Sequence, residues 1–144
     1  MTSEVTIREA RDDDAGALAV LLTQLGYPTD PPAVPGRMAR MRTETGQHIL
    51  VAVLDGEVVG TATVLVRHLI TRDSPLGRLA SVVVLDGLRS QGIGGRLIDE
   101  AERICRDAGC GVIEVTSQAQ RDRAHEFYLR RGYEEKPRRF IKTL

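Results

Sequence analysis

The chain of 144 residues has no tryptophan, only two cysteines and no excess charge of either sign. Lysine plus arginine and aspartate plus glutamate each number 20, so the chain as a whole offers no positive field to nucleic acid or to an anionic membrane. No apolar run approaches the roughly 18 residues that a membrane-spanning helix needs. These absences predict a protein with neither nucleic-acid nor membrane partners, in which any basic site is local.

The cysteines and histidines are too few and too scattered for a metal or disulfide framework. Cys105 and Cys110 are five positions apart with no histidine cluster nearby. His48, His68 and His125 fall in different predicted elements, so no metal site is expected, although His68 could line a substrate cleft. With an N-terminal segment that lacks a basic-then-apolar signal pattern, this cysteine usage predicts a reduced, cytoplasmic protein.

The length suits one domain with its own core, so residues 1–144 are expected to form a single domain. Asp55-Gly56 between two apolar runs is the strongest hairpin signal in the chain. The predicted order is β-α-α-β-β-β-α-β-α-β-β, an α/β (α+β) domain whose mixed, mostly antiparallel sheet carries helices on both faces. Strands are expected at 5–8, 49–54, 58–66, 79–85 and 112–116, with a terminal hairpin from 133 onward and over 138–144. Helices are expected at 12–25, 37–45, from the glycine turn to 108, and at 124–131, and the proline-dense segment 27–35 is expected to be a loop.

One glycine-rich turn carries the clearest chemical signal. The turn is Arg89-Ser90-Gln91-Gly92-Ile93-Gly94-Gly95-Arg96, and it lies between the apolar run 82–85 and an amphipathic helix. Backbone N–H groups at such a helix start bind phosphate well, and glycines let phosphate oxygens approach them. Leu97 replaces the third glycine of a dinucleotide fingerprint, and the Lys-Ser/Thr of a Walker loop is absent. The alternative is an ordinary strand-to-helix turn.

A second block follows about 35 residues later, Ala124-His125-Glu126-Phe127-Tyr128-Leu129-Arg130-Arg131-Gly132-Tyr133. The first block, read as Arg-x-x-Gly-x-Gly, resembles the pyrophosphate-binding signature of the GNAT family of N-acetyltransferases. The second resembles the later motif of the same family, Ala-x-x-Phe-Tyr-x-x-x-Gly-Phe/Tyr. Because both occur in the expected order and spacing, the resemblance implies the fold of that family and acetyl-CoA as cosubstrate.

The resemblance also implies roles for particular residues. The diphosphate of acetyl-CoA would bind at residues 89–96, and main-chain groups of Val82, Val83 and Val84 would pair with its pantetheine arm. Tyr128 would be the general acid that protonates the departing thiolate, since the pKa of a phenol is close to that of a thiol. The alternative reading of Tyr128 is a core aromatic residue.

The chain departs from the family pattern in two places. Many relatives carry glutamate in the strand before the glycine turn, but residues 78–81 here read Arg-Leu-Ala-Ser. Many also carry asparagine three residues before the motif alanine, where Arg121 stands. Arg121 is therefore kept as a coenzyme-binding candidate that would reach a phosphate.

The resemblance implies direct attack of a primary amine on acetyl-CoA in a ternary complex. Within the family, the C-terminal residues look most like the aminoalkylphosphonate and other small-amine enzymes, which favours a small-molecule acceptor. Two alternatives stay open: acetylation of a protein or peptide, and a non-catalytic acyl-CoA sensor. The family resemblance and the strand expected over residues 138–143, whose edge could pair with a second copy, also predict a homodimer.

Overall fold

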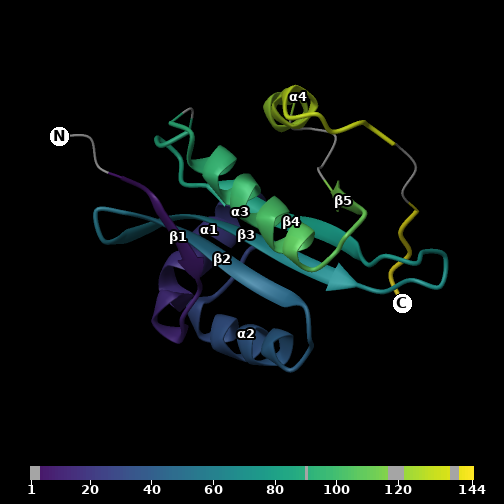
Figure 1. Cartoon of the computed structure of the whole chain (residues 1–144). Coiled ribbons are helices and arrows are strands. Elements are labelled where there is room, and N and C mark those ends of the chain that lie inside the picture. Colours follow the sequence, from purple (N-terminus) through teal and green to yellow (C-terminus); the bar gives the residue numbers. More distant parts are fainter. Residues whose placement is uncertain (1–3, 90, 117–121, 137–139) are drawn as a thin grey trace.

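The computed structural model describes residues 4–89, 91–116, 122–136 and 140–144. Its centre is a sheet in the order β1-β2-β3-β4-β5 (Figure 1). The first three strand pairs are antiparallel, and β4 and β5 run parallel. The strands are β1 Thr6–Glu9, β2 Gln47–Leu54, β3 Glu57–Arg67, β4 Leu76–Val84 and β5 Val112–Val115.

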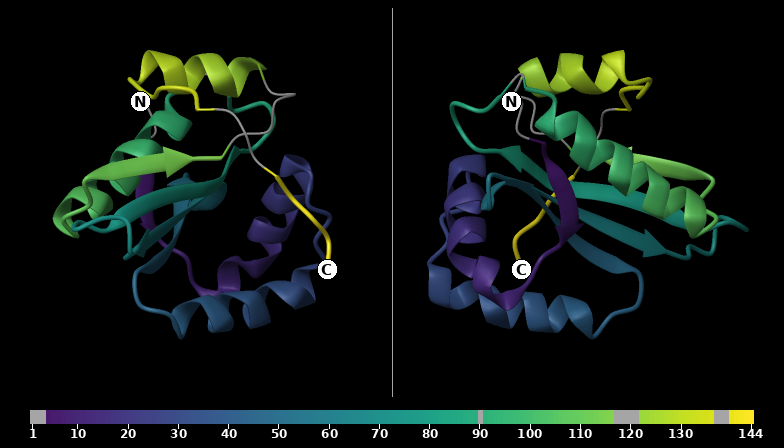
Figure 2. Two further views of the ribbon diagram at one scale, coloured as in Figure 1. Left: turned by 90° about the vertical axis from the view of Figure 1, so that its right-hand side faces the viewer. Right: turned by 60° about the vertical axis from the view of Figure 1, so that its left-hand side comes forward.

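Helices cover both faces of this sheet, as predicted (Figure 2). One face is covered by α1 Ala15–Leu25 and α2 Val34–Arg42, each preceded by a short 3-10 turn, η1 Asp12–Asp14 and η2 Pro31–Ala33. The other face is covered by α3 Ile93–Asp107, with α4 Asp122–Arg130 beside α3. Within the described residues, no helix is long and apolar enough to cross a membrane.

The sheet separates two apolar cores, because successive strand side chains point to opposite faces. On the α3 side, the buried stripe of the helix consists of Ile93, Leu97, Ile98, Ala101 and Cys105, so Cys105 is a core thiol. On the α1–α2 side, the smaller core contains Ala10, Leu18, Ala19, Val34, Met38 and Val51.

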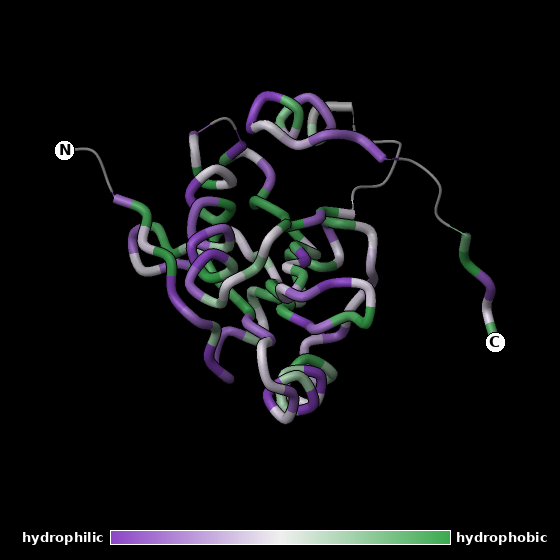
Figure 3. The backbone as a smooth tube through the Cα atoms, turned by 45° about the vertical axis from the view of Figure 1, so that its right-hand side comes forward, coloured by the Kyte–Doolittle hydropathy of each residue, from purple (hydrophilic) through white to green (hydrophobic). Residues whose placement is uncertain are grey.

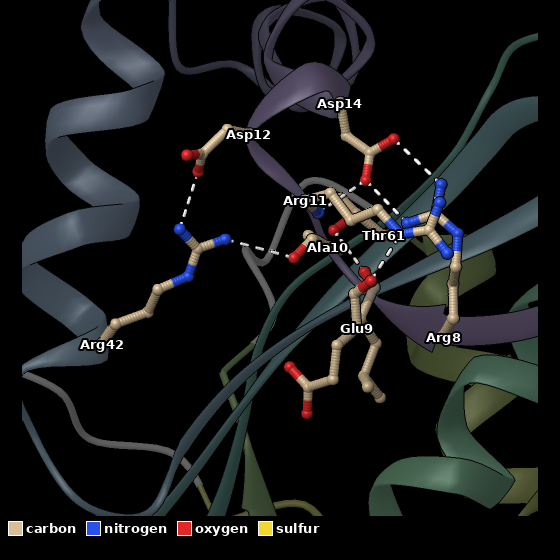
Figure 4. A network of polar contacts seen from close by, with 9 residues as sticks. Arg8, Glu9, Ala10, Arg11, Asp12, Asp14, Arg42 and Thr61 are labelled. Carbon is tan, nitrogen blue, oxygen red and sulfur yellow. Dashed lines mark hydrogen bonds and ion pairs between the residues drawn. The ribbon is translucent and has the colours of Figure 1, made fainter.

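An ion pair fixes the start of α1 to the edge of the sheet (Figure 4). The Arg8 guanidinium donates to both carboxylate oxygens of Asp14, at 2.7 and 3.0 Å, and the Arg11 N–H donates to Asp14 at 2.7 Å. Asp14 is buried, and its hydrogen bond with Arg8 lowers the pKa of the carboxyl group. Arg42 at the end of α2 joins the same region through Asp12, at 2.7 Å.

The predicted hairpin between β2 and β3 is confirmed. Asp55 and Gly56 both have positive φ, 52° and 79°, as a two-residue turn of type I′ requires. The proline-dense segment differs from the prediction: η2 lies within it, and α2 begins at Val34 and ends at Arg42. Proline suits the first turn of a helix, since no intrahelical N–H donor is needed there.

The predicted terminal hairpin is wrong for the described residues. Neither 133–136 nor 140–144 forms a strand, and residues 137–139 lie outside the described part. Phe140, Ile141 and Leu144 are 94%, 81% and 110% exposed, and Figure 3 shows this end of the chain standing away from the body of the molecule. Alternation alone does not make a strand when no neighbouring strand supplies hydrogen bonds.

Candidate active site

The strands β4 and β5 pair over only part of their length. The parallel register begins with Leu76 beside Val112 and ends with Leu79 beside Val115, whereas β4 continues to Val84. Among the described residues, the edge of β4 beyond Leu79 has no strand beside it. An open strand edge presents backbone donors and acceptors that an extended ligand can satisfy.

A bulge lies at the point where the two strands separate. Thr61 of β3 pairs with Val83 and Thr63 pairs with Ala80, so β4 contains one extra residue between these pairs. Ser81 in the bulge has φ of 55°. A bulge re-aims the backbone groups that follow it, and a left-handed residue other than glycine is a feature of constrained functional sites.

The backbone of Val82 and Val84 faces the open edge. Val83 pairs with Thr61 of β3, and the Leu85 N–H donates to Val59 of β3 at 2.8 Å. Because backbone groups alternate in direction along a strand, Val84 and Val82, the neighbours of Val83, direct their backbone groups away from β3 and toward the open edge.

A glutamine of α1 reaches this edge. The Gln24 side-chain N–H donates to the Val84 carbonyl at 2.8 Å, and the Gln24 carbonyl accepts from the Asp86 N–H at 2.9 Å. Gln24 therefore joins α1 to the end of β4 and to Asp86 in the segment that leads to the glycine turn. Sequence reasoning missed Gln24, although a polar residue among the leucines of a helix was a signal worth following.

The glycine turn leads directly into α3. Gly92 has φ of 80° and no side chain to cap the helix, and its carbonyl accepts from the Arg96 N–H at 3.1 Å. Ile93 is buried and fixes the first turn in the core. The amides at residues 93–95 have no acceptor within the helix, so they are donors at the positive end of its dipole. This arrangement suits a phosphate group.

Two glycines of the turn differ in what surrounds them. A Cβ at Gly94 would lie 3.7 Å from a methyl carbon of Val84 and 3.8 Å from the Phe127 ring, which is ordinary contact. A Cβ at Gly95 would lie 3.2 Å from the guanidinium of Arg131. A Cβ would therefore fit at Gly94, whereas Gly95 leaves room for the Arg131 side chain, in addition to the access to the amides expected from the sequence.

Two contacts hold the residues after α4 against α3, beside which α4 lies (Figure 2). Arg131 pairs with Asp99 of α3 and lies 5.5 Å from the centre of the Phe127 ring. The Tyr133 hydroxyl donates to Glu102 of α3 at 2.9 Å. Sequence reasoning missed these anchors. Asp99 is exposed and Glu102 is half-buried, and charges on a helix surface usually need no explanation.

Tyr128 lies between two other aromatic rings. The centres of the Phe127 and Tyr133 rings are 5.4 and 5.6 Å from its own, both in edge-on geometry. Burial raises the pKa of Tyr128 to about 12. The expected match to a thiol pKa is therefore poorer than the sequence suggested, but the hydroxyl stays protonated through neutral pH and is a proton donor there.

The remaining predicted residues are placed as follows. Arg89 pairs with Asp86 at 2.9 Å, and Gln91 and Arg96 are exposed. Ser90 and Arg121 lie outside the described residues.

The histidines lie apart from the bulge. His48 and His125 contact Glu9 and Glu135, at 2.8 and 3.1 Å. His68 directly follows Arg67, and Arg67 pairs with Leu76 of β4. At the usual rise per residue of a strand, Leu76 lies about 16 Å along β4 from Ser81. His68 therefore lies beside the end of β4 that is farther from the bulge. The part of the chain that the structure describes has no group of three or more metal-ligating side chains.

These features define a class of protein. An open strand edge, a bulge and an uncapped helix start follow one another along the chain and match a ligand with an extended amide arm and a phosphate end. A Cβ at Gly92 would be strained, and no side chain caps the amides beside it. A ligand with these parts is typical of acyl-coenzyme A-dependent transferases.

Comparison with known proteins identifies the family. Residues 14–133 match the model of the acetyltransferase (GNAT) family, so the chain belongs to that family and is an N-acetyltransferase by class. An aminoalkylphosphonate N-acetyltransferase of Salmonella typhimurium is 31% identical, covering 96% of this chain and 90% of the relative. An aminoglycoside N(6')-acetyltransferase type 1 of Stenotrophomonas maltophilia is 33% identical, covering 96% and 92%. The solved aminoglycoside N-acetyltransferase AAC(6')-Iy in complex with CoA shares the fold at a TM-score of 0.85, with 20% identity over 100% of this chain and 97% of that one.

Proposed function

We propose that the protein transfers the acetyl group of acetyl-CoA to a primary amine of a small molecule, by direct attack in a ternary complex. The observation that carries the proposal is the continuous path from the bulge at Ser81, along the open edge of β4, to the uncapped start of α3. Acetyl-CoA has a matching order of parts: a thioester, an amide-containing arm and a diphosphate.

Binding of the coenzyme is assigned to backbone groups. The N–H groups at the start of α3 would hold the diphosphate, with Arg89 and Arg96 adding positive charge. The backbone of Val82 and Val84 would pair with the amide arm. Gln24 occupies the Val84 carbonyl and would share it with the ligand or be displaced from it.

Acetyl-CoA supplies an activated acetyl group as a thioester. The neutral amine forms a C–N bond to the acetyl carbon, and the C–S bond breaks with its electron pair on sulfur. Tyr128 would donate its hydroxyl proton to that sulfur and recover a proton from solvent. A backbone N–H beside the bulge would stabilise the negative charge on the acetyl oxygen. Residues 78–81 of β4 contain no carboxylate, and the amine would lose its own proton to water.

The two curated relatives support a small acceptor. Their names specify aminoalkylphosphonates and aminoglycosides, both small molecules that carry amines. Each relative is covered over at least 90% of its length, so the similarity includes the parts that would contact the acceptor.

A turnover screen tests the proposed function. Acetyl-CoA is mixed with the protein and with aminophosphonates, polyamines, amino sugars or peptides in turn, and free thiol and acetylated product are measured. Thiol release that depends on a small amine is the expected result. Turnover with peptides alone would indicate a protein acetyltransferase. Coenzyme binding without thiol release from any mixture would indicate a sensor and contradict the proposal.

A further inference from the structure

An open region of the sheet lies beside the bulge on the α1–α2 side. On the α3 side, Val82 and Val84 pack against the larger core, so an acceptor cannot approach there. On the α1–α2 side, the smaller core is centred on Val51 of β2 and on the two helices. The paired parts of β4 and β5, around Arg78 and Glu114, are left partly exposed on this side. An amine that reaches the bulge therefore comes across this open region.

Arg78 and Glu114 form an ion pair within this region. They are direct neighbours in the parallel register of β4 and β5, and the Arg78 side-chain Nε lies 3.8 Å from a Glu114 carboxylate oxygen. Their sequence neighbours Leu79, Ile113 and Val115 pack into the α3-side core. Because strand side chains alternate, Arg78 and Glu114 lie on the opposite, open face.

The ion pair is accessible and weak enough to be exchanged. The side chains of Arg78 and Glu114 are 36% and 51% exposed, and 3.8 Å is too long for a hydrogen bond. A guanidinium group with unfilled donors binds carboxylate or phosphate-type oxygens well, often through two hydrogen bonds. Arg78 can therefore accept an external anion without losing a strong internal partner.

The position of Arg78 suits the acceptor of the transfer reaction. Arg78 precedes Ser81 by three positions, about 10 Å along the strand, and an extended arginine side chain spans a large part of that distance. On the other side, Leu65 pairs with Arg78 and lines a hollow of about 390 Å³ together with Arg67 and His68. This hollow, which Glu44 also lines, has room for a small molecule, and Arg78 is the register partner of Leu65 in its wall.

We propose that Arg78 binds an anionic group of the acceptor, so that the preferred substrates are small primary amines carrying a phosphonate, phosphate or carboxylate a few bonds from nitrogen. This inference rests on the proposed function. Glu114 holds Arg78 in the open region and competes with the anion for it, and Arg78 is a binding residue that selects among amines.

Matched acceptors test the proposal. KM and kcat are measured for 2-aminoethylphosphonate, β-alanine and ethanolamine, which share a two-carbon spacing and differ in the charged group. Wild-type protein is expected to have the lowest KM for one or both anionic amines, and the comparison of phosphonate with carboxylate identifies the preferred anion. Arg78→Gln is expected to raise KM for the anionic amines about tenfold or more, the usual effect of losing a charge-assisted hydrogen bond, and to leave ethanolamine within about twofold.

Two further variants separate this role from a structural one. Arg103→Gln on α3 removes the same charge on the other side of the sheet and is expected to leave all three KM values unchanged. Glu114→Gln removes the competing carboxylate and is expected to lower KM for the anionic amines, a gain that damage to the fold does not produce. Equal KM increases for charged and neutral amines in Arg78→Gln, or a raised KM for the anionic amines in Glu114→Gln, would overturn the proposal. If wild-type protein acetylates ethanolamine as well as the anionic amines, the anion site is refuted and the transferase activity stands; if no amine of the wider screen is acetylated, both fail.

Discussion

Gly94→Asp places a negative charge at the start of α3, where the diphosphate is expected to bind. Gly94 is the second residue of the helix, and a Cβ there meets only Val84 and Phe127 at 3.7 and 3.8 Å. Replacing a glycine inside a helix by a residue with a side chain adds up to about 1 kcal/mol of stability. A carboxylate near the start of a helix adds about 0.3–1 kcal/mol. The variant protein should therefore fold, with a melting temperature equal to or above that of the wild type.

The same carboxylate should abolish coenzyme binding. Two unit charges 4 Å apart near a protein surface repel by about 4 kcal/mol, so even after screening by salt the affinity should fall by about 100-fold or more. Wild-type protein with CoA at 100 times its Kd gains about 2.7 kcal/mol, which raises the melting temperature of a chain of this size by about 5–10 °C. Gly94→Asp should lose this increase, whereas Gly94→Ala should retain most of it. An equal CoA-induced increase in Gly94→Asp would refute the assignment of the phosphate site to α3.

Three other predictions concern the structure around the site. Gln24→Met keeps the side-chain length but removes the hydrogen bonds from Gln24 to Val84 and Asp86. Isothermal titration calorimetry should then give a CoA affinity that differs at least threefold from that of the wild type, with little loss of stability. An unchanged affinity would contradict the link between α1 and the open edge. The pKa of Asp14 is lowered in the folded state, so its contribution is present above the unfolded pKa of about 4 and is lost as pH falls through the lower folded value. Asp14→Asn should therefore destabilise by about 2 kcal/mol at pH 7 and by much less near pH 2 in denaturant titrations, and a gap independent of pH would count against the ion pair with Arg8. Sedimentation velocity at micromolar concentration should show a homodimer that Phe140→Asp and Ile141→Asp weaken, because these exposed apolar side chains need a partner; a single monomeric species with and without CoA would refute this.

Most of the fold could be predicted from local patterns. Asp55-Gly56 specifies its turn by itself, and the spacing of Ile93, Leu97, Ile98, Ala101 and Cys105 defines both α3 and its buried face. These signals depend on neighbours in sequence, which a single chain contains. The alternation of apolar and polar residues after Tyr133 wrongly predicted a hairpin for the described residues. A strand also needs a neighbouring strand, and no local sequence pattern shows whether one is present.

The candidate site was predictable only in outline. The glycines at 92, 94 and 95 and the tyrosine at 128 were recognisable from their spacing. The bulge at Ser81, the reach of Gln24 across 60 residues and the pairing of Arg78 with Glu114 depend on strand register and on packing between distant segments. Register is set by the whole sheet, so the sequence alone does not bring these residues together.

The most direct test of the account measures turnover and coenzyme affinity in the same Tyr128→Phe preparation. Loss of the proton donor should lower kcat by about 100-fold or more, with the Kd for acetyl-CoA within about twofold, because the interaction is made mainly in the transition state. Tyr133→Phe is the matched control, since its hydroxyl binds Glu102 of α3 and its loss should reduce stability with little change in kcat. Equal kcat values for wild type and Tyr128→Phe, with the chemical step shown to limit the rate, would contradict the mechanism.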